Sequence, residues 1–275
     1  MDLSYYINSF LVECERRCLA KNTVRLYSEV LYAMQRTIKS TDDRGVKQYI
    51  ENLVGKPGTN HLKMSIVKRF FNWTIKQGVY KTNPTDSIES VKFSNERSRC
   101  LTTEEVSRLL ECCDPTMKMI VSIALLTGLR RSAILELKHA EIDIANNRIT
   151  VQSKGKTHRI PITEPLWQIL LHAELKDHPV YLFPNKKGNG PLDNNAMIDF
   201  RKACIKAGIK DFRFHDLRHT MATNLLRATG NIYLVQKALG HSSIATTQRY
   251  AHLIDDDLRN GLNQLNIGGT MSAVH

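Results

Sequence analysis

The stretch from His215 to Tyr250 reads HDLRHTMATNLLRATGNIYLVQKALGHSSIATTQRY, and it decides how the rest of the sequence is interpreted. His215 and Arg218 stand one helical turn apart, so we expect them on the same face of a helix. Apolar residues continue that spacing until Gly230, which is predicted to end the helix. The stretch therefore begins with a helix that presents an imidazole and a guanidinium side by side.

A second predicted helix, 232–239, is followed by a glycine and then directly by His241 at the mouth of a turn. Ser242 and Ser243 are predicted to cap a further helix that carries Tyr250. Two histidines, an arginine and a tyrosine in this order are hard to explain by packing alone. Such a set of cationic and proton-carrying groups suits chemistry on a phosphate.

HDLRHTMAT followed by LGHSSIATTQRYAHL resembles the catalytic half of the tyrosine recombinase (phage integrase) family. The family pattern is His-x-x-Arg, then Leu-Gly-His, then a tyrosine nine residues further on. His215, Arg218, His241 and Tyr250 fill those positions. The resemblance is strong from residue 101 to about 252 and weaker over 1–90, and it favours the simple two-domain type of Xer or Cre-like recombinase.

Two further positions of the family pattern lie upstream. Thr-Gly-Leu-Arg resembles the motif of the first family arginine and places it at Arg130, with Arg131 as the alternative that is expected to face solvent. The family's hairpin lysine is assigned to Lys154, with Lys156 as the near competitor because hairpin registers are hard to predict. The resemblance thus implies six catalytic residues: Arg130, Lys154, His215, Arg218, His241 and Tyr250.

The resemblance also implies a mechanism of DNA strand cleavage. Tyr250 would attack the phosphate and leave a 3′-phosphotyrosine, the two arginines would hold its non-bridging oxygens, and His241 would hydrogen-bond a phosphate oxygen. His215 is a plausible acceptor for the tyrosine proton, and Lys154 would protonate the leaving 5′-oxygen. The family works as a homotetramer through a Holliday junction. No cofactor is expected, since no metal-ligand spacing or phosphate-binding loop is present.

One position departs from the family pattern. The acidic residue that usually follows the first arginine by three positions is replaced by Ala133, and Glu136 starts about 5 Å further along the helix axis. Two rival functions therefore stay open. One is a type IB topoisomerase activity without synapsis, and the other is a catalytically weak DNA-binding or accessory protein.

Charge points to a polyanionic partner. The formal net charge is +12 over 275 residues, which favours nucleic acid or an anionic membrane surface. Residues 1–95 hold 15 Lys and Arg against 9 Asp and Glu, so the excess is shared by both parts of the chain. With no membrane span or secretory signal visible, the expected partner is double-stranded DNA, with accessory DNA-bending proteins possible partners, in the cytoplasm or on the nucleoid.

The expected architecture is mostly α with a small antiparallel β-sheet. Residues 1–90 predict a four-helix core-binding (SAM-like) DNA-binding domain, 91–101 a linker, and 102–275 the catalytic domain with a C-terminal tail helix. Its Thr102-x-x-Glu105 spacing predicts a capping box. Two of the predicted helices are defined by their starts, one at residue 22 or 23 and one at residue 41. The other predicted helices are 3–19, 61–76, 117–126, 132–137, 164–175 and 194–207, and the predicted strands are 148–152 and 159–162.

Basic residues recur on the fourth predicted helix. A solvated helix face is the ordinary interpretation of such residues, and contact with DNA phosphates is the functional one. The net charge brings the two interpretations to about even odds. The residues concerned are Lys63, Lys68, Arg69 and Lys76.

Overall fold

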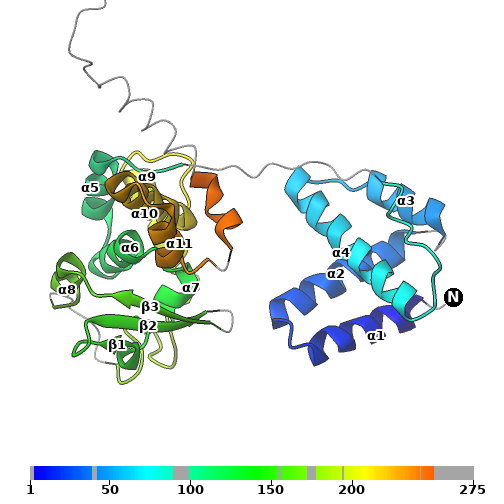
Figure 1. The fold of residues 1–275 in the computed structure, drawn as a ribbon, viewed down its shortest axis with the longest axis horizontal. Coiled ribbons are helices and arrows are strands. Elements are labelled where there is room, and N and C mark those ends of the chain that lie inside the picture. The colour runs from blue at the N-terminus through cyan, green and yellow to red at the C-terminus, as the bar shows by residue number, and fades with distance from the viewer. Residues whose placement is uncertain are drawn as a thin grey trace, which may run out of the picture. The chain divides into compact units, whose positions relative to one another are not determined.

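The computed structural model describes residues 3–38, 42–88, 99–153, 156–171, 178–193, 195–241 and 243–250. Helices dominate, and the strands form one three-stranded antiparallel sheet (Figure 1). This confirms the predicted fold class. The chain divides into two compact units, Met1–Asn95 and Glu96–His275, which are described separately. Over these described ranges, none of the helices combines the length and apolar character that crossing a bilayer requires.

The first unit consists of four helices around an aromatic and aliphatic core. Leu31, Met34, Phe70 and Phe71 are all fully buried in it, and the Phe10 ring meets the Phe70 ring edge-on at 5.6 Å between centroids. These contacts join the first, second and fourth helices into one core. The helices are α1 (Leu3–Arg16), α2 (Lys21–Thr37), α3 (Asp43–Glu51) and α4 (Pro57–Lys76).

Helix starts in the first unit differ from the predictions. Helix α2 begins before the predicted caps Asn22 and Thr23, and the residue at its N-cap, Ala20, provides no side-chain cap. Helix α3 is capped by Asp42, whose carboxylate accepts the Gly45 N–H, rather than opened by residue 41. Helix α4 starts at Pro57, because proline fits the first turn of a helix, where its missing N–H costs no hydrogen bond.

The second unit packs helices against the sheet. The predicted capping box is confirmed, since Thr102 and Glu105 cap α5 reciprocally. The elements in order are α5 (Thr103–Cys112), α6 (Pro115–Thr127), α7 (Arg131–Leu135), η1 (His139–Glu141), β1 (Ile142–Asp143), β2 (Arg148–Ser153), β3 (Lys156–Pro161), α8 (Glu164–Leu171), α9 (Ala196–Lys206), α10 (Phe214–Thr229), α11 (Ile232–Leu239), η2 (Ile244–Thr246) and η3 (Gln248–Tyr250).

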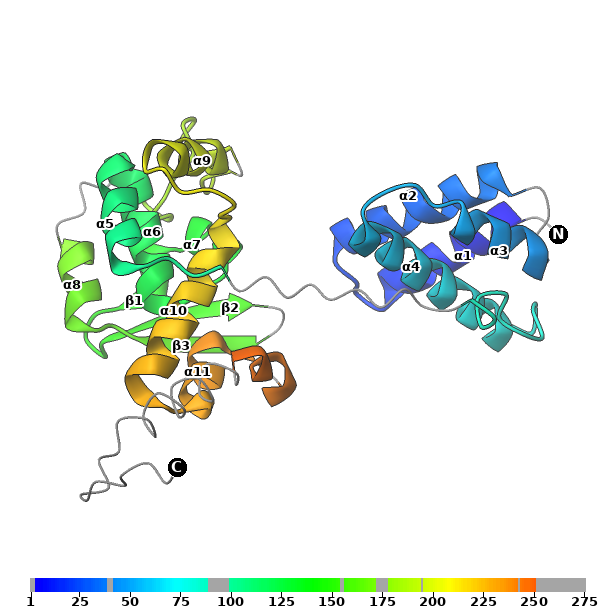
Figure 2. The same cartoon turned by 90° about the horizontal axis from the view of Figure 1, so that it is seen from above.

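The sheet contains the predicted hairpin. Strands β2 and β3 pair antiparallel with Ser153 opposite Lys156, and β1 adds to the other edge of β2. Strand β3 starts three residues earlier than predicted, since its pairing with β2 continues to the pair formed by Ser153 and Lys156. Ile149 and its partner Ile160 are buried, so this face of the sheet meets the core. Helix α11 lies beside β3 (Figure 2).

Helix α10 is the central element of the second unit. It packs against α6 and α11, and Leu217 and Ala222 on it are fully buried. Gly230 ends α10 and Gly240 ends α11, both in the left-handed conformation, with φ of 62° and 60°. The two glycine stops predicted from the sequence are confirmed. They fold the chain back so that η3 reaches α10.

Candidate active site

Arg218 on α10 is the most buried charged residue of the predicted set, with 4% of its surface exposed. Its guanidinium donates to the Gly128 carbonyl and to the Leu239 carbonyl, so it joins the turn after α6 to the end of α11. Burial, with the Arg130 cation adding to it and Tyr250 opposing it, lowers the pKa of Arg218 to about 10. Arg218 therefore stays charged at neutral pH, with three of its five N–H groups outside these two bonds.

Arg130 comes from the turn between α6 and α7. Gly128 adopts φ 61° to end α6, Leu129 is buried, and Arg130 occupies the N-cap position of α7 with an extended backbone. Its side chain is half-buried, and its charge acts on both Arg218 and His158. Arg131 is exposed, as predicted. The two arginines thus lie close enough to repel each other, an arrangement that favours binding a phosphate anion between them.

His241 is fixed in the turn that follows α11. Its Nδ1 lies 3.0 Å from the Thr247 hydroxyl, and its N–H donates to the Gln236 carbonyl. Ser243 caps η2 by accepting the Ala245 N–H, which confirms the predicted serine cap there; residue 242 lies outside the described residues. Instead of one helix, two short 3₁₀ turns lead to Tyr250.

Tyr250 is docked against α10 rather than exposed. Only 5% of its surface is accessible, and it packs with Met221, Leu226 and Val235. Its hydroxyl lies 2.5 Å from Nδ1 of His219, a residue of which only 8% is exposed. The predicted acceptor, His215, is exposed at the start of α10, and its ring meets the His219 ring edge-on at 5.1 Å. The sequence interpretation gave no role to His219, although His215, His219 and Thr223 recur at helical spacing.

A second histidine joins the site without having been predicted. His158 on β3 donates from Nε2 to the Lys237 carbonyl of α11. Burial lowers the pKa of His158, the Lys237 carbonyl opposes that shift, and the Arg218 and Arg130 charges add to it. A Cβ added to Gly240 would stand 3.3 Å from the His158 ring, so the backbone just before His241 packs closely against this imidazole. Strand alternation provides the signal, because His158 shares the core-facing side with Ile160.

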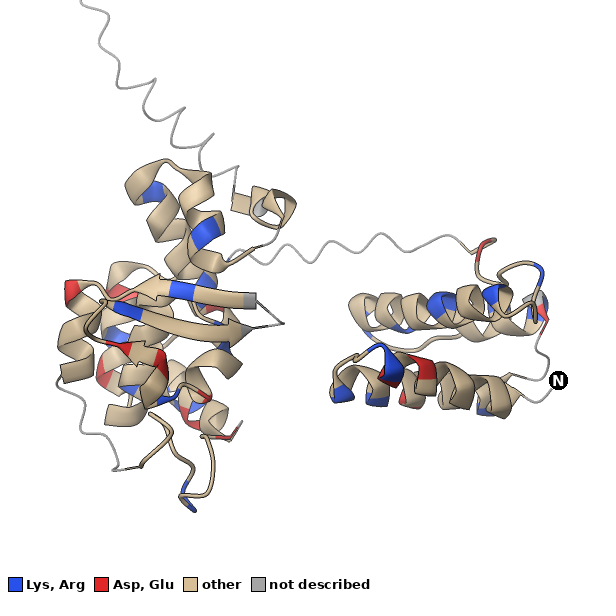
Figure 3. Cartoon of the chain, turned by 60° about the horizontal axis from the view of Figure 1, so that its bottom comes forward, with Lys and Arg blue, Asp and Glu red and all other residues tan. Residues whose placement is uncertain are grey.

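The predicted hairpin lysine, Lys154, lies outside the described residues, so its role stays a prediction. Ala133 is half-buried against the core at the position of the usual acidic residue, and Glu136 is exposed at the end of α7. Figure 3 shows Lys and Arg on the strands and on the helices of both units, interspersed with Asp and Glu.

The basic residues of α4 are partly brought together. Lys68, Arg69 and Lys76 line a hollow of about 370 Å³ with Trp73 and Arg17, whereas Lys63 is not among its lining residues. Arg69 also stacks over the Tyr27 ring at 5.8 Å, and Lys68 pairs with Asp86 at 3.1 Å. A cationic hollow with an aromatic wall is compatible with contact to a nucleic acid backbone.

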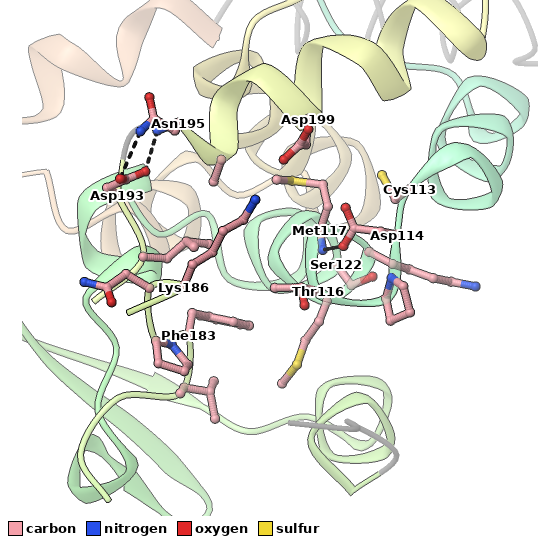
Figure 4. Close-up of a pocket in the computed structure, with 18 of the residues that line it drawn as sticks. Cys113, Asp114, Thr116, Met117, Ser122, Phe183, Lys186, Asp193, Asn195 and Asp199 are labelled. Carbon is pink, nitrogen blue, oxygen red and sulfur yellow. Dashed lines mark hydrogen bonds between the residues drawn. The ribbon is translucent and has the colours of Figure 1, made fainter. Parts of the chain in front are cut away.

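Another cavity lies elsewhere in the second unit. It measures about 1140 Å³ and is lined by residues of α6, the 182–193 segment and α9, with Asp114, Lys186, Asp193 and Asp199 around it (Figure 4). Both acidic and basic side chains line it, and none of the five predicted catalytic residues that the structure describes is among its lining residues. We therefore place the chemistry at the arginine and tyrosine cluster around α10 rather than in this cavity.

Known proteins resemble the chain over most of its length. Tyrosine recombinase XerC of Proteus mirabilis is 29% identical over 278 residues, covering 91% of this chain and 90% of the relative. XerC of Salmonella typhi is 30% identical over 210 residues, 72% of this chain and 70% of the relative. The integrase of Salmonella phage P22 is 34% identical over 186 residues, 62% of this chain and 48% of that protein.

Solved structures share the fold. The crystal structure of XerA recombinase is 26% identical, with a TM-score of 0.53, and covers 96% of this chain and 98% of that one. A lambda integrase (75–356) dimer bound to a COC′ core site is 20% identical with a TM-score of 0.75, covering 90% and 97%. XerH bound to palindromic difH substrate is 21% identical with a TM-score of 0.72, covering 90% and 81%.

The arrangement around α10 and this shared fold define a tyrosine recombinase, an enzyme that cleaves and rejoins DNA. More narrowly, the chain belongs to the phage integrase family, whose model matches residues 99–256. The resemblance stated from the sequence motifs is thereby confirmed.

Proposed function

We propose that this recombinase cleaves each DNA strand through a covalent 3′-phosphotyrosine at Tyr250 and exchanges strands through a Holliday junction. The observation that carries the proposal is the burial of Arg218 beside Arg130 and Tyr250. A buried, charged guanidinium next to a second guanidinium is costly without an anion, and a DNA phosphate supplies that anion. The nucleophile belongs to the same cluster.

The side chains around the phosphate have distinct roles. Arg130 and Arg218 stabilise the extra negative charge that develops on the non-bridging oxygens, an effect typically worth a few kcal/mol per donor. Guanidinium suits this task because it binds two oxygens at once. His241, oriented by Thr247, donates a further hydrogen bond. Lys154 protonates the 5′-oxygen as it leaves, and the tyrosine gives its proton to a histidine of α10.

The reaction runs without a metal ion or ATP. The phosphotyrosine ester conserves the energy of the broken phosphodiester, so religation needs no external energy source. The helical first unit (1–90) and the second unit (102–275) are both proposed to contact duplex DNA, with 91–101 as the linker. The solved relatives include lambda integrase and XerH bound to their DNA sites.

The assembly is proposed to be a homotetramer on two synapsed sites, with accessory DNA-bending proteins where a site requires them. Lys68, Arg69 and Lys76 are proposed to contact phosphates from the hollow on α4, and Lys63 contributes charge alongside them. The protein would act in the cytoplasm, on the nucleoid.

Tyr250→Phe provides the test. The substitution removes only the nucleophilic oxygen, so binding to DNA should persist while the covalent adduct disappears. The substrate is a nicked suicide duplex that carries a site selected by the protein from random DNA, and the adduct is scored on a denaturing gel. An adduct formed by Tyr250→Phe would show that another residue is the nucleophile.

The same assay addresses the rival that Ala133 keeps open. If the protein is a catalytically weak accessory protein, its wild-type form would bind the selected site but form no adduct. Restoring the acidic residue in an Ala133→Glu variant should then increase adduct formation, whereas a fully active recombinase should gain little from it.

A further inference from the structure

The hydroxyl of Tyr250 already has a partner that can take its proton. Nδ1 of His219 lies 2.5 Å from the Tyr250 oxygen, and both side chains are buried. A general base must lie within hydrogen-bond reach of the proton that it removes, about 2.6–3.2 Å or through one water. His219 therefore meets the geometric requirement in the DNA-free protein.

His215, the residue predicted for this role, occupies a different place. It is exposed at the first turn of α10, one turn before His219, and its ring contacts the His219 ring edge-on at 5.1 Å. The rings of His219 and Tyr250 lie 5.8 Å apart between centroids. The three side chains thus form a row in which His219 stands between the exposed imidazole and the buried phenol.

The chemistry of an imidazole suits this role. A neutral ring carries one nitrogen with a lone pair, which is what a proton acceptor needs. Titratable or charged groups surround this ring. His215 and Tyr250 contact it directly, and Asp216 and Arg218 precede it on α10. Further groups on the elements around α10 are Arg130 before α7, His241 after α11, and Cys100, whose thiol hydrogen-bonds the Thr223 hydroxyl of α10.

We propose that His219 is a catalytic residue of this recombinase and acts as the general base that removes the proton from Tyr250. The inference rests on the proposed function. As the Tyr250 oxygen forms its bond to phosphorus, its O–H bond breaks and the proton moves to Nδ1 of His219. The P–O5′ bond breaks, and the 5′-oxygen takes a proton from Lys154. Religation reverses each transfer, so His219 returns its proton to the departing tyrosine.

The negative phosphate makes this transfer feasible. An imidazolium beside Arg218 would be disfavoured in the free protein, yet the bound phosphate brings negative charge next to both groups. His219 would then be a better base when DNA is bound than when it is absent.

The experiment compares His219→Asn with wild type in single-turnover cleavage of the nicked suicide duplex between pH 5.5 and 9.5. Asparagine places an amide oxygen near the position of Nδ1, so it keeps the hydrogen bond to Tyr250 without accepting a proton. We expect adduct formation at pH 7 to fall by about 10²–10⁴-fold. The deficit should shrink as pH rises, since hydroxide removes the phenol proton without a base.

His215→Asn is the matched control on the same face of α10. It should slow cleavage by a factor that does not depend on pH. The acidic limb of the wild-type profile, which is the fall in cleavage rate as the pH decreases, should remain. A His219→Asn rate equal to wild type, or reduced by one constant factor at every pH, would overturn the proposal. So would a His215→Asn variant that loses the acidic limb while His219→Asn keeps it.

A second measurement needs no change at His219. Replacing Tyr250 with 3-fluorotyrosine makes the phenol more acidic in an otherwise wild-type chain. If an imidazole base sets the acidic limb, its midpoint should stay in place, whereas a limb set by the phenol itself would move to lower pH and refute the assignment. Tyr250→Phe serves as the control for the proposed function, since an adduct formed by that variant would reject Tyr250 as the nucleophile and with it His219 as the base, whereas a failure of the His219 test alone would leave the nucleophile in place.

Discussion

Gly128→Ala perturbs the turn that anchors Arg218. Gly128 ends α6 at φ 61°, and its carbonyl accepts a hydrogen bond from the Arg218 guanidinium. A Cβ there would stand 2.0 Å from Cε of Met221 and 3.2 Å from Cδ2 of Leu239. Gly230 is a matched control, because it ends α10 at φ 62° and a Cβ added to it would meet nothing within 4 Å.

The two substitutions separate backbone strain from crowding. The left-handed conformation costs alanine about 1–2 kcal/mol at either position. Gly128→Ala must also move the methyl end of Met221, which is flexible but buried, so we take the lower end of the usual overpacking cost, about 1 kcal/mol. We therefore expect the free energy of unfolding to fall by about 2–3 kcal/mol for Gly128→Ala and about 1–2 kcal/mol for Gly230→Ala.

Urea unfolding of the full chain measures these losses. The protein has two tryptophans, Trp73 in the first unit and Trp167 in the second. In a Trp73→Phe background, fluorescence therefore reports only the unit that carries the substitution. Equal losses for Gly128→Ala and Gly230→Ala would refute the crowding at Met221. Adduct formation should fall only for Gly128→Ala, because its carbonyl holds Arg218.

Three further predictions address the leaving group, the DNA contacts and the buried thiols. Lys154→Ala should cleave ordinary DNA about 10²–10⁴-fold more slowly, and its rate should recover on a substrate with a 5′-bridging sulfur, because the thiolate leaves without a proton. Lys156→Ala should reduce the cleavage rate only slightly on both substrates, and the opposite pattern would assign the catalytic role to Lys156. DNA affinity should fall steeply with salt, with a log–log slope of about −0.9 per phosphate contact, so a flat dependence in filter binding would contradict two DNA-binding units. Burial raises the pKa of Cys113 and of Cys204 from 9.0 to about 11, so the free energy of unfolding of the second unit should fall between pH 9 and 11, where the thiols ionise only in the unfolded state. Cys204→Ala should make this fall smaller, and a fall as large as in the wild type would exclude the Cys204 thiol as its source.

Local signals predicted much of the architecture. The stops of α10 and α11 were predicted because a glycine in the left-handed conformation is a property of the chain within one turn. The box formed by Thr102 and Glu105 was predicted for the same reason. The start of α2 was not, because Ala20 supplies no capping side chain and Asn22 offered a misleading one.

The site was predicted in part. The motif spacing predicted that Arg130, Arg218 and Tyr250 belong to one cluster, and Arg130 and Tyr250 are both near enough to affect the pKa of Arg218. The partner of the Tyr250 hydroxyl could not be predicted in this way, because His219 is 31 residues away in sequence. Which of two histidines on one helix face meets the tyrosine depends on how η3 docks against α10, and no local periodicity encodes that packing.

The double anchorage of Arg218 has a consequence for the choice of inactive variants. Its guanidinium satisfies the buried carbonyls of Gly128 and Leu239, and leaving each without a donor costs about 1–3 kcal/mol. An Arg218→Ala protein would lose its activity and part of its scaffold together, so its phenotype could not be read as a catalytic defect alone. A binding-competent dead enzyme for capturing assemblies on DNA is therefore better made at Tyr250 than at the arginine that also holds two turns in place.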